Sequence, residues 1–143
     1  MKIRLLKEQD LNHGFIECLE ELGKCQTKLN EMHLIFKQRR KSGIKTFVVV
    51  EKEGGRVIGT GSLILEPKFR YKEKCGHIED VCVVSNYQGK GIGLKLLNHI
   101  INYAKNKKCY KLILSSNNHN LGFYSKLGFL PHENGLRLDL FNL

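Results

Sequence analysis

The segment from Gly76 to Leu97 restricts the possible folds of this chain more than any other part of it. Its first part, Ile78–Val84, is rich in β-branched residues and has no helical spacing, which predicts a strand largely buried on both faces. After a break at Ser85–Tyr87, apolar residues recur at the spacing of a helix, at Leu94, Leu97, Ile101 and Ala104. The segment therefore predicts a strand, a glycine-rich turn and a helix in succession.

The turn has glycine at positions 89, 91 and 93. Glycine permits positive φ and lets a ligand approach the backbone closely. The first N–H groups of a helix have no partner within it and favour anions, so a phosphate group is the expected ligand. A P-loop is excluded because no hydroxyl residue follows Lys90, and a dinucleotide-binding fingerprint would need an acidic residue near Leu114–Ser116.

Gln88–Gly93 matches the Gln/Arg-x-x-Gly-x-Gly/Ala signature, and the chain resembles the GCN5-related N-acetyltransferases (GNAT) at this point. The resemblance implies that the turn binds the pyrophosphate of coenzyme A and that the preceding strand hydrogen-bonds the pantetheine arm. The alternative is a glycine-rich connection that binds no ligand.

The length and composition predict one domain, residues 1–143, without a membrane span. Because the charged N-terminus also lacks the apolar core of a signal peptide, we expect a soluble, cytoplasmic protein. The five cysteines form no close pair or Cys/His cluster, which favours free thiols and no metal site. Cys82 as an acetyl-accepting nucleophile is an alternative, but no His or Asp is placed nearby in the sequence to activate it.

The formal net charge of +10 favours anionic partners: nucleic acid, acidic membrane or phosphorylated small molecules. The densest basic run, Lys37–Lys41, has no interleaved aromatic residues and no groove-reading motif. A solvated helix end explains this run better, so neither a nucleic-acid nor a membrane partner is expected.

Hydrophobic patterning predicts an α/β (α+β) mixed sheet with the order β-α-α-β-β-β-α-β-α-β-β, which is also the order of the GNAT fold. The expected elements outside the central segment are a strand at Ile3–Leu6, helices at Leu11–Leu22 and Thr27–Lys41, strands at Lys45–Glu51 and Arg56–Leu65 with a turn at Glu53–Gly55, a strand at Tyr110–Leu114, a helix at Asn118–Leu127, and strands starting at Gly128 and spanning Leu136–Leu140.

Four motifs together extend the resemblance over most of residues 60–129. They are Gly76–Asp80, Tyr87–Gly93, Cys109–Leu114 and Phe123–Phe129, and they are similar to those of the eukaryotic glucosamine-6-phosphate N-acetyltransferases. That family transfers acetyl from acetyl-CoA to the 2-amine of glucosamine 6-phosphate by direct attack in a ternary complex, and its product feeds UDP-N-acetylglucosamine synthesis. The resemblance also implies a homodimer whose active sites are completed by the partner subunit.

The resemblance assigns cofactor contacts to two short stretches and two single residues. They are Val81, Cys82, Val83 and Val84 for pantetheine, Gln88, Gly89, Lys90, Gly91, Ile92, Gly93 and Leu94 for pyrophosphate, and Asn120 and Tyr124. Tyr124 is the expected catalytic acid near the thioester sulfur, because a phenol can protonate a departing thiolate. Its alternative role is packing with Phe123 and Phe129.

Sugar contacts by resemblance come from the basic loop, the central strand and the strand after the helix. They are Lys68, Phe69, Arg70, Tyr71, Glu79, Asp80, Tyr110 and Lys111, the last two from the partner subunit. Glu79 and Asp80 can accept the proton of the amine, and strand alternation predicts that only one of them enters a given cleft. Ordinary solvated charge is the alternative for the basic loop.

Three positions depart from the family pattern. Ser115 replaces a family Asp at the amine, Gly23 replaces a Thr, and Asp139 stands in place of an Arg, with Arg137 the nearest substitute for phosphate binding. The substrate is then held differently, with water or His119 assisting, or the acceptor is another amine, such as a polyamine or a protein lysine. A non-catalytic nucleotide or nucleic-acid binder is the alternative of another class.

Overall fold

The computed structural model describes the whole chain, residues 1–143, and has a five-stranded sheet in the order β1-β2-β3-β4-β5. The strands are β1 (Lys2–Leu5), β2 (Lys45–Val50), β3 (Val57–Pro67), β4 (Lys74–Val83) and β5 (Cys109–Ile113). All neighbours are antiparallel except β4 and β5, which are parallel and joined through a helix. The α/β mixed-sheet prediction is therefore confirmed.

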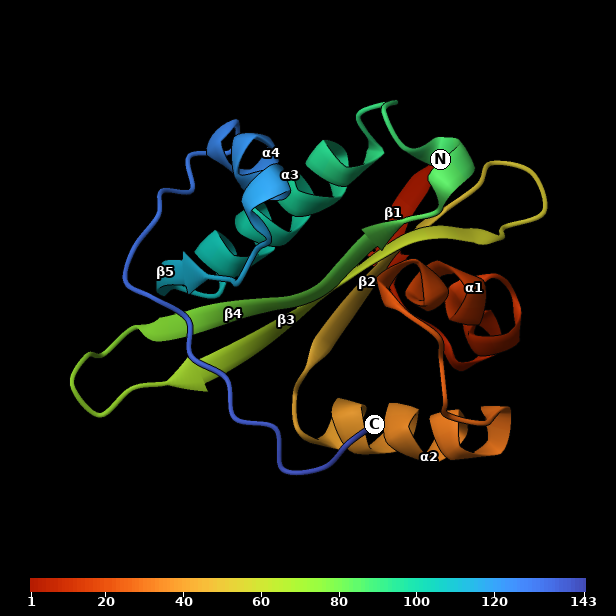
Figure 1. Cartoon of the computed structure of the whole chain (residues 1–143), viewed down its shortest axis with the longest axis horizontal. Coiled ribbons are helices and arrows are strands. Elements are labelled where there is room, and N and C mark those ends of the chain that lie inside the picture. The colour runs from red at the N-terminus through yellow and green to blue at the C-terminus, as the bar shows by residue number, and fades with distance from the viewer.

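Helices cover both faces of this sheet (Figure 1). The helices are α1 (Phe15–Leu19), α2 (Leu29–Lys41), α3 (Ile92–Asn106) and α4 (Leu121–Ser125), with 3-10 turns at Glu8–Asn12, Glu20–Leu22, Ser85–Tyr87 and Asn118–Asn120. Each helix is too short or too polar to span a lipid bilayer.

The alternation of β2 explains why the sheet is buried on both sides. Phe47 and Val49 pack in one core with Leu96 and Ile100 of α3. Val48 and Val50 point the other way, into a second core with α1 and α2. Because successive strand residues face opposite sides, a continuous apolar run is what a sheet between two helical layers requires.

The expected helix over Leu11–Leu22 is wrong as a continuous element. It is divided into a 3-10 turn, α1 and a second 3-10 turn, and Gly14 before α1 has a φ of +94°. A Cβ at this position would lie 2.6 Å from the carbonyl oxygen of Val57. The break thus brings this segment close against β3, a contact that helical periodicity alone does not reveal.

The two strands expected after residue 127 are also absent. Residues 130–143, here called the C-terminal arm, form no strand and make no backbone hydrogen bond (Figure 1). Leu136, Leu138 and Leu140 alternate as expected, but each is about 80% exposed or more. An extended segment becomes a strand only by hydrogen-bonding to a neighbouring strand, and the arm pairs with no free edge of the sheet.

Candidate active site

The glycine-rich turn presents a continuous run of free amides. Gly89 and Gly91 have φ values of +73° and +74°, and Gly91 is the N-cap of α3. The N–H groups of residues 89–94 donate to no backbone or side-chain acceptor, and the first amide of this region that does is Lys95, to the carbonyl of Gly91. Free amides at the positive end of a fifteen-residue helix make an anion-binding cradle.

Side chains around this cradle stabilise the turn. The amide Nε2 of Gln88 donates to the carbonyl of Val83 at 2.8 Å, and Lys90 Nζ donates to the carbonyl of Asn86 at 2.9 Å. On the other side, a Cβ on Gly93 would lie 3.0 Å from Cζ of Phe123. Gly93 therefore serves close packing of α3 on α4, whereas Gly89 and Gly91 serve the conformation of the turn.

A cleft opens where β4 and β5 separate. The two strands pair only from Lys74 to His77 of β4, and the rest of β4 has no neighbour on that side. The resulting cleft has a volume of about 420 Å³. Its lining residues come from β4, the segment after β5, α4 with its preceding turn, and the 3-10 turn after α1: Leu22, Ile78, Glu79, Asp80, Val81, Leu114, Ser115, Ser116, Asn117, Asn120 and Tyr124. An unpaired strand edge can hydrogen-bond an extended amide-containing chain such as pantetheine.

A β-bulge in β4 places both Glu79 and Asp80 along this cleft. Ser62 of β3 pairs with Glu79 and Thr60 with Cys82, so β4 has one more residue than β3 between these pairs. Asp80, in the bulge, has a φ of +52°. The expectation that only one of Glu79 and Asp80 enters the cleft is therefore wrong, because a bulge interrupts strand alternation.

Tyr124 lies in the cleft and also packs with aromatic neighbours. It is half-buried and contacts the rings of Phe123 and Phe129 edge-on, with centroid distances of 5.0 and 6.0 Å. Of these three rings only that of Tyr124 lines the cleft. Burial raises the pKa of the Tyr124 phenol, so the group is protonated at neutral pH and can donate a proton.

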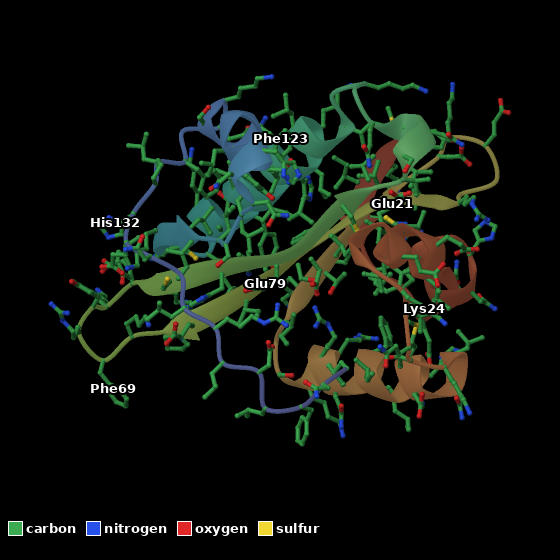
Figure 2. The ribbon with its side chains drawn as sticks, viewed as in Figure 1. Glu21, Lys24, Phe69, Glu79, Phe123 and His132 are labelled. Atoms are coloured by element: carbon green, nitrogen blue, oxygen red, sulfur yellow. The ribbon has the colours of Figure 1, made fainter.

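The basic loop lies apart from this cleft. Lys68 is paired with Glu66 at 2.7 Å, and Phe69 is fully exposed at the tip of the β3–β4 hairpin, far from Glu79 (Figure 2). Tyr71 and Tyr110 stack with their ring centroids 4.7 Å apart. Arg70 and Lys111 lie over these two rings. The loop and the Tyr110–Lys111 pair thus form a separate exposed aromatic and basic surface.

Three further positions bear on the predicted site. Ser115 lies in the cleft, whereas Arg137 is exposed on the C-terminal arm and pairs with Asp139. The Cys82 thiol is buried, 3.7 Å from Sγ of Cys18, and this contact and burial raise its pKa, which argues against a nucleophile. The cleft residues Leu22, Ser116 and Asn117 were not anticipated, and no local sequence signal distinguishes them.

Comparison with known proteins agrees with this architecture. Residues 8–129 match the Acetyltransferase (GNAT) family. A glucosamine 6-phosphate N-acetyltransferase of Trypanosoma brucei brucei is 40% identical over 98% of this chain and 96% of its own length. The corresponding enzyme of Arabidopsis thaliana is 36% identical over 89% of this chain and 88% of its own.

Solved structures give the same result. A Trypanosoma brucei acetyltransferase superposes with a TM-score of 0.90 at 40% identity, covering 97% of this chain and 99% of the other. The Arabidopsis thaliana glucosamine-6-phosphate N-acetyltransferase superposes with a TM-score of 0.92 at 34% identity, covering 98% of each chain. The chain belongs to the GNAT family of acetyltransferases.

Proposed function

We propose that this enzyme transfers the acetyl group of acetyl-CoA to the 2-amine of glucosamine 6-phosphate, by direct attack of the amine in a ternary complex. The observation that carries the proposal is the cleft between β4 and β5 next to the free amides of residues 89–94. The relatives that align over nearly the whole chain, which are named for this reaction, support the choice of acceptor.

The residues around the cleft suit acetyl-CoA as co-substrate. Amides 89–94 would hold its pyrophosphate, with Gln88 and Lys90 keeping the turn in place. The free edge of β4 from Val81 to Val83, together with the following Val84, would hydrogen-bond the pantetheine arm, and Asn120 also lines the cleft. Acetyl-CoA supplies an activated acyl carbon and a thiolate leaving group.

Two proton transfers are needed: one away from the attacking amine and one to the departing sulfur. Glu79 and Asp80 share the cleft and can accept the proton that the amine must lose. This replaces the carboxylate missing at Ser115, whose hydroxyl is a poor base. Tyr124, kept protonated by burial, would donate its phenolic proton or a hydrogen bond to the departing sulfur.

The proposal includes a homodimer. The exposed apolar arm of residues 130–143 and the Tyr71–Tyr110 surface would both lose solvent exposure against a second copy. A partner that covers this surface would bring Lys68, Arg70, Tyr110 or Lys111 to the neighbouring cleft. A cytoplasmic location is part of the same proposal, supported by five cysteines that are all free thiols.

The experiment is release of coenzyme A thiol from acetyl-CoA with different acceptors. Glucosamine 6-phosphate, unphosphorylated glucosamine, spermidine and a lysine peptide are compared at equal concentration. We expect the highest kcat/KM with glucosamine 6-phosphate. A higher kcat/KM with spermidine or the peptide would show that the acceptor is another amine and not glucosamine 6-phosphate. The presence of Ser115 in place of the family Asp would then reflect this different acceptor.

A further inference from the structure

A second cavity lies between α2 and the sheet, and it shares one lining residue with the active-site cleft. It has a volume of about 800 Å³, and its apolar wall includes Leu11, Phe15 and Phe36. Asp80 lines both this cavity and the cleft between β4 and β5. A molecule with its reacting group at the bulge of β4 can therefore extend into the space under α2.

Arg39 of α2 provides a fixed positive charge in this cavity. Its Nη2 donates to the hydroxyl of Ser62 at 2.8 Å and to that of Thr46 at 3.2 Å. Both hydroxyls belong to buried residues and lie 3.1 Å from each other. Nη1 and Nε make no hydrogen bond, and no carboxylate pairs with the guanidinium.

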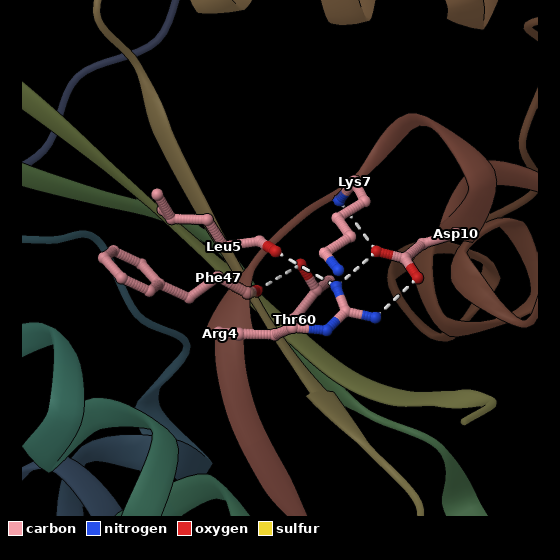
Figure 3. A network of polar contacts seen from close by, with 6 residues as sticks. All are labelled: Arg4, Leu5, Lys7, Asp10, Phe47 and Thr60. Atoms are coloured by element: carbon pink, nitrogen blue, oxygen red, sulfur yellow. Dashed lines mark hydrogen bonds and ion pairs between the residues drawn. The ribbon is translucent and has the colours of Figure 1, made fainter.

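Neighbouring charges leave the cavity positive at this end. Arg40 and Lys45 also line it and have no carboxylate partner within 4.0 Å, while its two carboxylates are Glu8, which contacts His33 at 2.9 Å, and Asp80 at the bulge. By contrast, Arg4 is neutralised, because its two terminal nitrogens bind both oxygens of Asp10 at 2.6 and 2.8 Å (Figure 3). Charge complementarity therefore favours an anion beside Arg39 rather than a cationic ligand such as a polyamine.

The position of Arg39 relates this charge to the reacting centre. Ser62, which Arg39 contacts, lies directly opposite Glu79 in the β3–β4 ladder, and adjacent strands are about 4.8 Å apart. The guanidinium therefore lies next to β3, and only the spacing between β3 and β4 separates that strand from the bulge of β4, where the amine of the acceptor is expected. This separation suits a small rigid acceptor with an amine at one end and an anionic group at the other.

We infer that Arg39 binds the phosphate of the acceptor, with the sugar lying between this residue and Asp80. A guanidinium held by two hydroxyls presents its remaining N–H donors in fixed geometry, which suits two oxygens of a phosphate. This inference rests on the proposed function for the identity of the acceptor. It also explains how the phosphate is bound although Asp139 occupies the position of the family Arg.

The test compares Arg39→Met with Lys37→Met. Each change removes one positive charge from α2, but Lys37 does not line the cavity. For Arg39→Met we expect KM for glucosamine 6-phosphate to rise at least tenfold, with KM for acetyl-CoA and the slow rate with unphosphorylated glucosamine unchanged. Lys37→Met should match the parent enzyme in all three, and Arg39→Lys should give an intermediate KM.

Two results separate this inference from the proposed function. If the parent enzyme acetylates glucosamine 6-phosphate and Arg39→Met retains the KM of Lys37→Met, the assignment of Arg39 is wrong and the function stands. If the parent enzyme does not acetylate glucosamine 6-phosphate, the proposed function is wrong. The rise in Tm caused by inorganic phosphate then tests whether Arg39 binds an anion. A smaller phosphate-induced rise in Tm for Arg39→Met than for Lys37→Met supports it, and an equal rise overturns it.

Discussion

Gly93 on α3 faces the ring of Phe123, and a Cβ at Gly93 would lie 3.0 Å from Cζ of that ring. The contact joins the start of the helix that carries the amide cradle to the short helix that carries Tyr124. The cradle and Tyr124, the proposed proton donor, are therefore positioned relative to each other by one glycine that has no special φ of its own.

Gly93→Val should lower the free energy of unfolding by about 1–3 kcal/mol, because the added methyl groups overpack the contact with Phe123. It should also raise KM for acetyl-CoA as the cradle moves. Gly122→Ala in α4 is the control, since nothing lies within 4 Å of its Cβ position and alanine favours a helix. Urea unfolding of both variants checks this, and equal stability of the two would contradict it.

Tyr124→Phe should lower kcat by about 10²-fold or more, because the departing sulfur loses its proton donor. Urea unfolding at pH 7 should show little change, since the ring and its contacts with Phe123 and Phe129 are retained. Steady-state kinetics with glucosamine 6-phosphate measures kcat, and an unchanged value would remove Tyr124 from the mechanism.

The raised pKa of Tyr124 also predicts the alkaline pH dependence. The proposed proton donor is the protonated phenol, so kcat should fall only when this group loses its proton. Because its pKa is above the ordinary tyrosine value of about 10, that fall should occur above pH 10. A kcat profile recorded to about pH 9 should therefore show no appreciable decline caused by this group. A decline near pH 8 that disappears in Tyr124→Phe would be inconsistent with the assignment.

Asp10→Asn should lower the free energy of unfolding by about 3–5 kcal/mol at pH 7, because it leaves the Arg4 guanidinium without its buried partner. Burial raises the pKa of Asp10, but the hydrogen bonds from Arg4 and the Lys7 amide outweigh it, so the pKa is below its ordinary value. The contribution is thus present above the unfolded pKa of about 3.9 and is lost as pH falls through the folded one.

Urea unfolding at pH 7 and at pH 3 tests this sign. The difference between the parent protein and Asp10→Asn should shrink at pH 3. Asp139→Asn, which changes an exposed pair on the C-terminal arm, should have no measurable effect at either pH. A difference that stays constant with pH would contradict the role of the Asp10 charge.

Replacing Leu136 and Leu138 together by Ser should convert a dimer into a monomer, because these side chains supply apolar area on one face of the arm. Arg137→Ser is the control: it changes the residue between the two leucines, which alternation places on the other face of the arm, and it should leave the dimer intact. Sedimentation velocity at micromolar concentration distinguishes the two species. A parent protein that sediments as a monomer would reject the proposed dimer.

Several features of the candidate site could be predicted from the sequence because they follow local rules. Glycines 89 and 91 have the positive φ expected of them, and a helix, α3, follows the turn as the apolar spacing predicts. Tyr124, Asn120 and Ser115 lie in one cleft, as the resemblance implied. The broken first helix was not predictable, because the close contact of Gly14 with Val57 joins segments distant in the chain.

By itself the sequence determined the α/β order as far as α4, the strand before the glycine turn and the helix after it, because backbone conformation and residue spacing act over a few neighbouring residues. Only the tertiary structure decided that Glu79 and Asp80 line one cleft, that Arg39 reaches Ser62, and that the C-terminal arm pairs with no strand. Each of these depends on the register of paired strands or on helix packing, and such contacts join residues whose positions in the sequence contain no record of their proximity.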